Sequence, residues 1–520
     1  MRKIVISSII LFASILLVNA QTTEFDAINF AQREINGTAR YMGMAGAFGA
    51  LGGDVSAVKD NPAGLGVFRR SELTTTFNFQ NQNSKSTWDN NTAHDDLFKF
   101  GFSNFSYVMS FETYSGKNGY SGLQYSNFGF SYNRLKNFNR NVTVRNYDMN
   151  SSISDFIASY ANNSGITPDN FLYNEDGSLF IDNEFFFNED EGGGFPFLTI
   201  LGYESGLINY NSNGKWRSFL SDGDLTSSSY YLTERGYVDE YSFSWGGNIS
   251  NIVYLGVALN YTTISYSKSI NYQESYISPN NSYMDSHISS SMRTWGNGFN
   301  ANFGIIVRPF DQLRIGVSYL TPTLYSLRDD INNASIDRGD YPAPNTYYDY
   351  EIRVPGRFTG SLAYVIGQKA IISTDFNYTH YSNLKLYNDK GDSQDYVYEN
   401  GVIKQKLKGG MTFKVGAEYR ITNSFSVRAG FAAETVFMGK DMAREPLLNT
   451  VRMDTDYFIH DGKNYFTLGA GYKGRYWNFD LAFVNKNLHE KFAPYYHEDM
   501  NLASVVTRNY DIVATVGFRF

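Results

Sequence analysis

Cysteine is absent from this chain of 520 residues, and proline occurs only 11 times. Without cysteine the protein has no disulfide, no thiol nucleophile and no thiolate ligand for a metal. Because proline is confined to turns and to the edges of sheets, its scarcity leaves room for many uninterrupted strands. No Pro-rich, Ser-rich or charge-run linker divides the chain. We therefore expect one large folded unit rather than several small domains.

Histidine is also scarce, and the six copies are His94, His287, His380, His460, His489 and His497. None of them stands at a metal-ligand spacing such as His-x-x-x-His. His489 and His497 are predicted to share one extracellular loop, where they could touch a haem, but simple exposure is the favoured interpretation. No Ser/His/Asp or paired-carboxylate arrangement has a recognisable spacing. The sequence thus predicts no catalytic residue, no metal site, no cofactor and no enzymatic activity.

Only one stretch is apolar over a long run, and it lies at the N-terminus. Arg2 and Lys3 precede the run 4–18, and Val18-Asn19-Ala20 places small residues before Gln21. The run is shorter than the roughly 20 apolar residues of a membrane-spanning helix. Residues 1–20 are therefore predicted to be a signal peptide cleaved after Ala20. Loss of its two cations takes the net charge from −8 to −10, and an acidic exported chain is a poor partner for nucleic acid.

Aromatic residues, by contrast, are abundant, with 41 Tyr and 41 Phe. At the C-terminus they alternate with polar residues. The apolar positions there are Tyr510, Ile512, Ala514, Val516, Phe518 and Phe520. A period of two with one apolar face is typical of a half-buried strand. In a barrel that spans a membrane, the apolar face contacts lipid and the other face lines the lumen.

The same alternation recurs along most of the chain, in pairs of segments joined by tight turns. The clearest pairs are 299–307 with 313–319, 358–366 with 370–378, 413–419 with 425–431, and 466–472 with 477–483. About fourteen such strands can be counted, and short turns alternate with longer polar segments. We predict an all-β, antiparallel outer-membrane β-barrel over residues 71–520. Its longest extracellular insertion is predicted at 137–236, and its surroundings are the lipid and lipopolysaccharide of a Gram-negative outer membrane.

Residues 21–70 precede the first strand and are rich in small side chains. A barrel of fourteen strands encloses a lumen that its own side chains cannot fill. We therefore predict that this segment is a hatch that plugs the barrel. Gly43, Gly46, Gly49 and Gly52 are expected to let its backbone pack closely against the wall.

Two features of the long insertion leave alternatives open. Glu184, Glu189, Asp190 and Glu191 are dense enough to hold calcium, although a solvated acidic loop is favoured. The apolar run 195–201 follows them. It predicts either a capture site at the barrel mouth or folding of the loop onto itself.

The hatch also carries a motif. The stretch 39–54 reads ARYMGMAGAFGALGGD, and Asp60-Asn61-Pro62-Ala63-Gly64-Leu65 follows. This resembles the hatch of the FadL family of outer-membrane hydrocarbon transporters, which has a Gly/Ala-rich stretch, an Asp and then Asn-Pro-Ala. The resemblance extends through the strands to the terminal Phe520. It departs in the loops, because well-known members carry their large insertion later in the chain. The Tyr/Asn-rich composition is similar to that of Bacteroidota-like members.

The resemblance implies passive uptake of a small hydrophobic solute, fatty-acid-like or an aromatic hydrocarbon, by lateral diffusion through the barrel wall. It also implies that Asn61, Pro62, Ala63 and Gly64 hold the hatch in place. An alternative function is that of a structural or accessory subunit of an outer-membrane assembly or secretion complex. The long insertion would then dock other outer-membrane proteins.

The third strand contains a change of phase. Leu123 and Tyr125 share one phase, Phe128 to Tyr132 take the other, and Arg134 falls where lipid-facing residues are expected. A charge there costs roughly 2–4 kcal/mol at mid-membrane. We therefore predict a bend near Ser126–Asn127 or near Asn133–Lys136. In the family that this chain resembles, a kink in the third strand opens the wall, so Ser126, Asn127, Asn133 and Arg134 are candidate residues of such an opening. The alternative is an ordinary bulge at the membrane rim.

Overall fold

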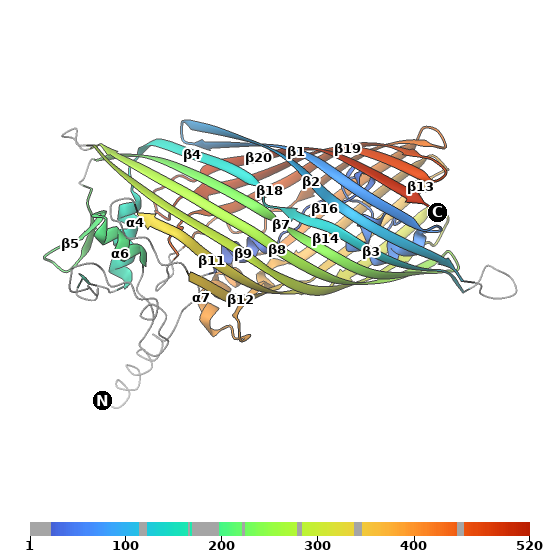
Figure 1. Cartoon of the computed structure of the whole chain (residues 1–520), viewed down its shortest axis with the longest axis horizontal. Coiled ribbons are helices and arrows are strands. Elements are labelled where there is room, and N and C mark those ends of the chain that lie inside the picture. The colour runs from blue at the N-terminus through green and yellow to red at the C-terminus, as the bar shows by residue number, and fades with distance from the viewer. Residues whose placement is uncertain are drawn as a thin grey trace, which may run out of the picture.

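The computed structural model is a closed β-barrel with a folded segment inside it (Figure 1). It describes residues 22–113, 122–164, 167–168, 197–220, 224–277, 283–336, 346–444 and 452–520. In this part of the chain no helix is long and apolar enough to cross a membrane.

The strands of the wall are β1 (Glu72–Trp88), β2 (Asn91–Glu112), β3 (Leu123–Asn137), β4 (Arg140–Met149), β7 (Leu225–Ile249), β8 (Val253–Ile277), β9 (Tyr283–Val307), β10 (Leu313–Leu320), β11 (Thr323–Ile336), β12 (Thr346–Val354), β13 (Arg357–Ile366), β14 (Ala370–His380), β15 (Lys385–Asn388), β16 (Gly409–Arg420), β17 (Phe425–Glu434), β18 (Tyr457–Lys473), β19 (Trp477–Ala493) and β20 (Ala503–Arg519).

Four of the fourteen wall strands are interrupted. β3 and β4 both pair with β7, and β10 and β11 both pair with β9. Likewise β12 continues β13, and β15 continues β14. Since each of these pairs forms one crossing of the wall, fourteen antiparallel strands remain. β1 pairs with both β2 and β20, which closes the barrel. The predicted fold is confirmed.

The alternation of side chains along β20 follows the predicted phase. Ile512 is 50% exposed, whereas Val513 is fully buried. The apolar face therefore looks outward, and Asp511, Thr515 and their neighbours look toward the lumen. Tight turns such as 250–252, 367–369 and 474–476 join the strands at one end, which we call the short-turn end. Longer connections such as 389–408 and 435–456 lie at the opposite, long-loop end.

The predicted insertion is narrower in the structure. Residues 140–149 and 225–236 are strand rather than loop, because β4 prolongs the third crossing and pairs with the start of β7. Between them lie α4 (Ile153–Ser164), α6 (Phe197–Glu204), β5 (Ile208–Tyr210) and β6 (Trp216–Ser218). Leu198, Ile200 and Leu201 of α6 are at most 3% exposed and pack in one cluster with α4. The described side chains of this run, 198–201, are thus buried rather than offered as a capture surface.

Two further predictions concern loops. Glu184, Glu189, Asp190 and Glu191 lie outside the described residues. His489 belongs to β19, whereas His497 lies in the connection that follows. The prediction that the two histidines share one loop was therefore wrong, because β19 extends beyond the apolar alternation that marked it in the sequence.

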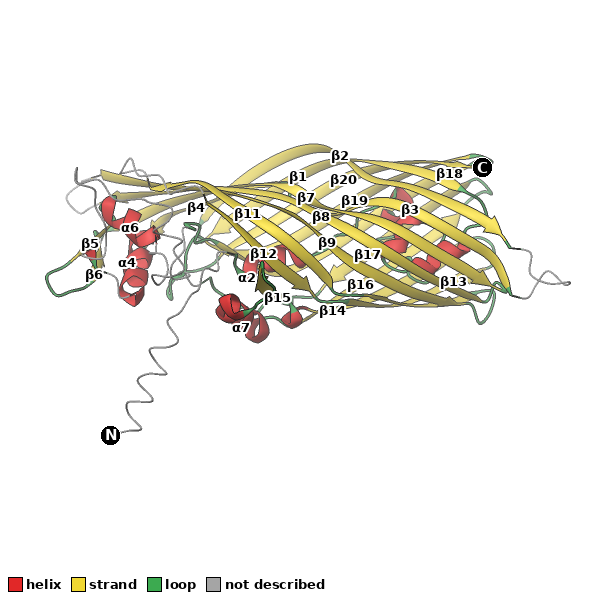
Figure 2. Ribbon diagram, turned by 60° about the horizontal axis from the view of Figure 1, so that its bottom comes forward, coloured by secondary structure: helices red, strands yellow, loops and turns green. Residues whose placement is uncertain are grey.

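The segment ahead of β1 lies inside the barrel (Figure 2). It contains α2 (Glu24–Ala31), α3 (Ala39–Met42) and the 3-10 helices η1 (Val55–Lys59) and η2 (Pro62–Val67). Each begins at a side chain that accepts a bond from the first turn, namely Thr23, Thr38, Asp54 and Asn61. Such caps stabilise helices too short to persist alone. We call residues 22–70 the hatch.

η5 (Tyr381–Asn383) connects β14 to β15, and η6 (Gln394–Tyr396) leads into α7 (Val397–Lys406). Both views show α7 projecting beside β12 (Figures 1 and 2), and Figure 2 shows it beside β15 as well. Ile403 of α7 packs in one buried cluster with Ile28 of α2.

Candidate functional site

A buried cluster of charges around Asp60 joins the hatch to the wall. Asp60 is 3% exposed and pairs with Arg357 of β13 at 2.9 Å and with Lys414 of β16 at 3.2 Å. The Tyr41 hydroxyl donates to the same carboxylate. Burial alone would raise the pKa of Asp60, but Lys414, Arg357 and Lys59 more than offset it and hold the pKa below its ordinary value. Asp60 is therefore an ionised anchor.

Burial has the opposite effect on the neighbouring cation. Lys59 is 4% exposed, and its ammonium donates to the Asn36 carbonyl and lies 4.6 Å from the centre of the Tyr41 ring. Burial lowers the pKa of Lys59 to about 8, although Asp60 works against this shift.

Other charged contacts fasten the hatch along its length. Arg40 pairs with Glu418 of β16 at 3.0 Å, and Glu34 pairs with Lys486 of β19 at 2.6 Å. Near the long-loop end Asp26 pairs with Arg452 at 2.5 Å. Because each pair joins the hatch to a residue outside it, the lumen-facing charges position the hatch rather than line an open channel.

The Asn-Pro-Ala-Gly motif lies where the hatch meets the wall. The Asn61 amide donates to the Gly49 carbonyl at 2.7 Å and to the Ile305 carbonyl of β9 at 3.3 Å. Its oxygen accepts from the Ala63 N–H at 3.1 Å, which starts η2 at Pro62. Gly64 lies against Gly52 within the hatch, where a Cβ would come within 3.0 Å of its Cα.

Wall glycines create the room for this contact. A Cβ on Gly304 of β9 would lie 1.9 Å from the Asn61 side-chain oxygen, and one on Gly256 of β8 would lie 2.2 Å from the Pro62 carbonyl carbon. Within the hatch, Gly43 meets Gly469 of the wall, as expected. Gly46 has a φ of +72°, so it serves a turn instead. Glycines in the middle of a strand, such as Gly256 and Gly304, mark a close approach of another backbone, and this signal in the sequence was missed.

Replacing Asn61 and Pro62 together with alanine is expected to loosen the hatch without unfolding the barrel. The change removes the cap of η2 and leaves the Gly49 and Ile305 carbonyls without this donor, at a cost of roughly 1–3 kcal/mol for each buried group left unpaired. Protease cleavage of the hatch in the folded barrel should accelerate. Asn423→Ala with Pro309→Ala, in two exposed turns, is the matched control. Equal cleavage of both variants would contradict the latch.

The wall has an interruption between β2 and the third crossing. Their ladder ends at the pair Asn104 and Asn133. Among the described residues, β2 beyond this point pairs through its backbone with β1 alone. The register of β3 against β7 shifts between Arg134 and Lys136, which turns β3 away from β2.

A cavity of about 50 Å³ occupies this gap. Lys99, Phe100 and Gly101 of β2 line one side and Arg134 lines the other. Phe98 and Phe100 are 66% and 60% exposed on the outer face, so the gap opens at the level of the apolar belt. Arg134 is held by Asp239 at 3.0 Å, which neutralises the charge that the sequence appeared to place in lipid.

The four residues predicted for a wall opening therefore divide into two groups. Asn133 and Arg134 lie at the gap, where Asn104 donates to the Asn133 side-chain oxygen at 2.8 Å. Asn127 instead donates to the Leu65 and Phe68 carbonyls of the hatch. Ser126 accepts from the Trp245 indole at 3.0 Å. These two belong to the hatch contact and to the β3–β7 contact.

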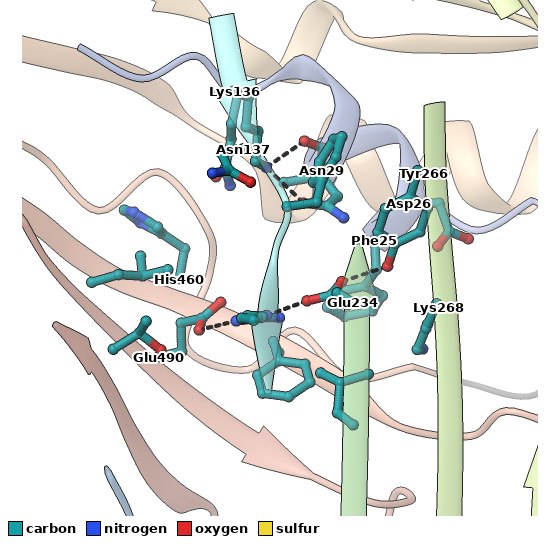
Figure 3. A pocket seen from close by; sticks show the side chains of 18 of the residues that line it. Phe25, Asp26, Asn29, Lys136, Asn137, Glu234, Tyr266, Lys268, His460 and Glu490 are labelled. Carbon is teal, nitrogen blue, oxygen red and sulfur yellow. Dashed lines mark hydrogen bonds and ion pairs between the residues drawn. The ribbon is translucent and has the colours of Figure 1, made fainter. Parts of the chain in front are cut away.

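A second cavity of about 120 Å³ lies in the lumen toward the long-loop end, beside α2 of the hatch. Apolar side chains of α2 and the wall line part of it, including Phe25, Ile28, Phe138 and Phe458. Charged groups line the rest (Figure 3). Arg140 pairs there with Glu234 and, at 2.6 Å, with Glu490.

The lumen cavity and the gap cavity adjoin. Their shared lining residues are Glu34, Asn137, Asn139 and Lys486. The gap between β2 and β3 thus lies beside the lumen cavity. Arg140, Glu234 and Glu490 were not singled out in the sequence, because a charged residue at a lumen-facing strand position carries no sign of its partner. Within the described ranges no group of His, Cys, Asp and Glu side chains could hold a metal ion.

Comparisons with known proteins agree with this architecture. No family model matches the sequence, and a search of curated proteins finds no match. Among solved structures, a Pseudomonas aeruginosa FadL homologue superposes with a TM-score of 0.53 at 12% identity, over 94% of this chain and 99% of that one. A deletion mutant of the monoaromatic hydrocarbon channel TodX gives 0.50 at 12% identity, over 93% and 99%. The fold implies an outer-membrane location, whereas the Bacteroidota-like origin stays a prediction. The chain has the fourteen-stranded fold of the FadL-type outer-membrane barrels.

Proposed function

We propose that this barrel is a channel for passive uptake of small hydrophobic molecules, which leave it sideways through the gap between β2 and β3. The observation that supports this most directly is that the lumen cavity adjoins the gap cavity, with four lining residues in common. A solute enters at the long-loop end, which we take as extracellular, and reaches the lumen cavity beside α2. The rest of the hatch fills the lumen below that cavity, so the proposed route turns toward the wall.

The lining favours an amphiphile over a plain hydrocarbon. Phe25, Ile28 and Phe458 offer apolar surface, but Lys486 with Glu34 and Arg140 with Glu490 stand on the same route. A solute without polar atoms would cover these ions without replacing their water, which is costly. A fatty-acid-like molecule has an apolar tail for the first set and a polar head for the second. Of the two solute classes considered, we therefore favour the fatty-acid-like one.

Closing the gap tests this route. We expect the variant Gly101→Cys with Arg134→Cys, joined by a short bifunctional thiol reagent, to lose uptake of a fluorescent fatty acid in proteoliposomes. A Cβ on Gly101 would lie 3.9 Å from the Arg134 guanidinium, so the two positions face each other across the gap. The natural chain has no cysteine to interfere.

The control is Met109→Cys with Phe128→Cys, which allows the same reagent to join the same two strands at a point where they are already paired. Cross-linking there should leave uptake unchanged. Reduction of a cleavable cross-linker should restore transport in the Gly101–Arg134 variant. Equal uptake before and after cross-linking at Gly101 and Arg134 would exclude the lateral route. No uptake by the uncross-linked natural protein would instead favour the assembly-subunit hypothesis.

A further inference from the structure

The outward side chains of the wall change from apolar to charged beside α7. Along β10 to β14 the outward positions are apolar or aromatic up to Leu324, Phe358 and Tyr378. The next outward positions on the neighbouring strands are Arg353 of β12 and Lys385 of β15. Their inward neighbours Ile352 and Leu386 are fully buried, which fixes the outward direction of both cations.

The height of these cations can be estimated along one crossing. Ile366 is 48% exposed near the short-turn end, and Arg353 lies thirteen positions from it along the same crossing, toward the long-loop end. At the usual rise per residue and a tilt near 45°, thirteen residues climb roughly 30 Å. An apolar band of about 25 Å ends below that level. Arg353 and Lys385 therefore lie where lipid headgroups begin.

The two cations are directly opposite each other on paired strands. Like charges in that arrangement repel each other. Of the nearby outward charges, Arg328 pairs with Asp349 at 2.5 Å, and Glu351 lies two positions from Arg353 on the same face of β12. Among the described residues, neither Arg353 nor Lys385 has an ion pair, and Lys385 only lies over the Tyr387 ring at 5.0 Å. An anion between them would relieve the repulsion.

α7 provides apolar contact beside this pair. It lies next to β15 (Figure 2), and its Val397 is 63% exposed and its Tyr398 39% exposed. Lys404 and Lys408 are also exposed, at the end of this helix and just beyond it. The opposite side of α7 packs on the hatch, since its Ile403 is fully buried in one cluster with Ile28 of α2. The cation pair and α7 together thus form one surface at headgroup level.

We propose that Arg353 and Lys385 bind a phosphate group of a phosphorylated glycolipid in the outer leaflet, with α7 resting on the adjoining acyl chains. A guanidinium binds two phosphate oxygens through parallel N–H donors, and an ammonium adds a compact charge. This site lies on the outside of the wall, so it is separate from the solute route and does not depend on it.

Native mass spectrometry of the purified barrel in mild detergent tests the site, with diphosphoryl lipid A as the probe. We expect Arg353→Gln with Lys385→Gln to weaken lipid A binding about tenfold or more, since both charge-assisted contacts are lost. The control Lys85→Gln with Arg508→Gln removes two exposed cations elsewhere on the wall and should bind as the natural protein does. Dephosphorylated lipid A should bind no more weakly to the double variant than to the natural protein.

Several results would overturn the proposal. Equal lipid A binding by both double variants would show that the charges at Arg353 and Lys385 are not used. An equal loss of dephosphorylated lipid would assign the binding to the acyl chains alone. Inorganic phosphate that competes fully with lipid A would make the site one for the free anion. If the double variant does not give the heat-modifiable mobility of a folded barrel, Lys385→Gln alone replaces it, and Arg353→Lys should retain binding.

Discussion

A barrel without residues 22–68 is expected to conduct ions continuously, whereas the natural protein stays closed. The hatch fills the lumen with side chains such as Tyr41, Phe48 and Leu65, each at most 1% exposed. Fourteen strands enclose more space than their own inward side chains can fill, so the deletion leaves an aqueous passage. We expect conductance in planar bilayers to rise roughly tenfold or more, together with leakage of small polar dyes from liposomes.

The deletion also removes the partners of buried wall charges, so folding has to be verified separately. Lys414 and Arg357 would face water in the open lumen, where they need no counter-ion, and the closed ladder of the wall does not include the hatch. Heat-modifiable mobility should therefore persist. Unchanged conductance of a folded deletion variant would show that the hatch does not close the barrel.

The barrel could be predicted from the sequence because its alternation is strict where lipid imposes it. Phe466, Leu468 and Tyr472 lie on the outer face of the wall, and each is more than half exposed. The interruptions could not be predicted as such. Pro322 precedes β11 and Pro355 follows β12, at facing positions of these paired strands. In a sequence, however, a proline marks a turn, an edge or a break equally well. The strand pairing shows that each strand continues, because β10 and β11 both pair with β9, and β13 and β12 pair with β10 and β11 in turn.

The candidate site could be predicted in part from the sequence, for a related reason. The Asn-Pro-Ala-Gly motif is local, because Asn61 caps its own helix and Pro62 begins it. The partners of the hatch are not local, since Asp60 pairs with a residue 354 positions away. In the third crossing, the change of phase at Arg134 marked a real shift of register. The change near Ser126 follows another shift, between Leu123 and Tyr125, where β3 leaves its turn.

Exchange of one carboxylate for an amide should release the hatch more effectively than any other single change. Asp60→Asn keeps the shape but removes the negative charge that Lys414, Arg357 and Lys59 share. Breaking a buried ion pair from one side typically costs about 3–5 kcal/mol, because the remaining charges stay buried without compensation. Asp311→Asn is the matched control. Its side chain is 85% exposed and pairs with Arg308 in a turn, and an exposed pair contributes only about 0–1 kcal/mol.

The pH dependence distinguishes this anchor from simple packing. The pKa of Asp60 is lower in the seated hatch than its ordinary value of 3.8, so its contribution is complete above about 3.8 and is lost as the pH falls through the lower value. The natural barrel should therefore stay closed at pH 5 and begin to conduct only in stronger acid. Asp60→Asn should conduct at pH 7 already and gain little on acidification. Asp60→Asn with Lys414→Met, which removes one of the uncompensated cations, should close the channel in part. Equal closure of the natural barrel and Asp60→Asn at pH 7 would show that packing alone holds the hatch.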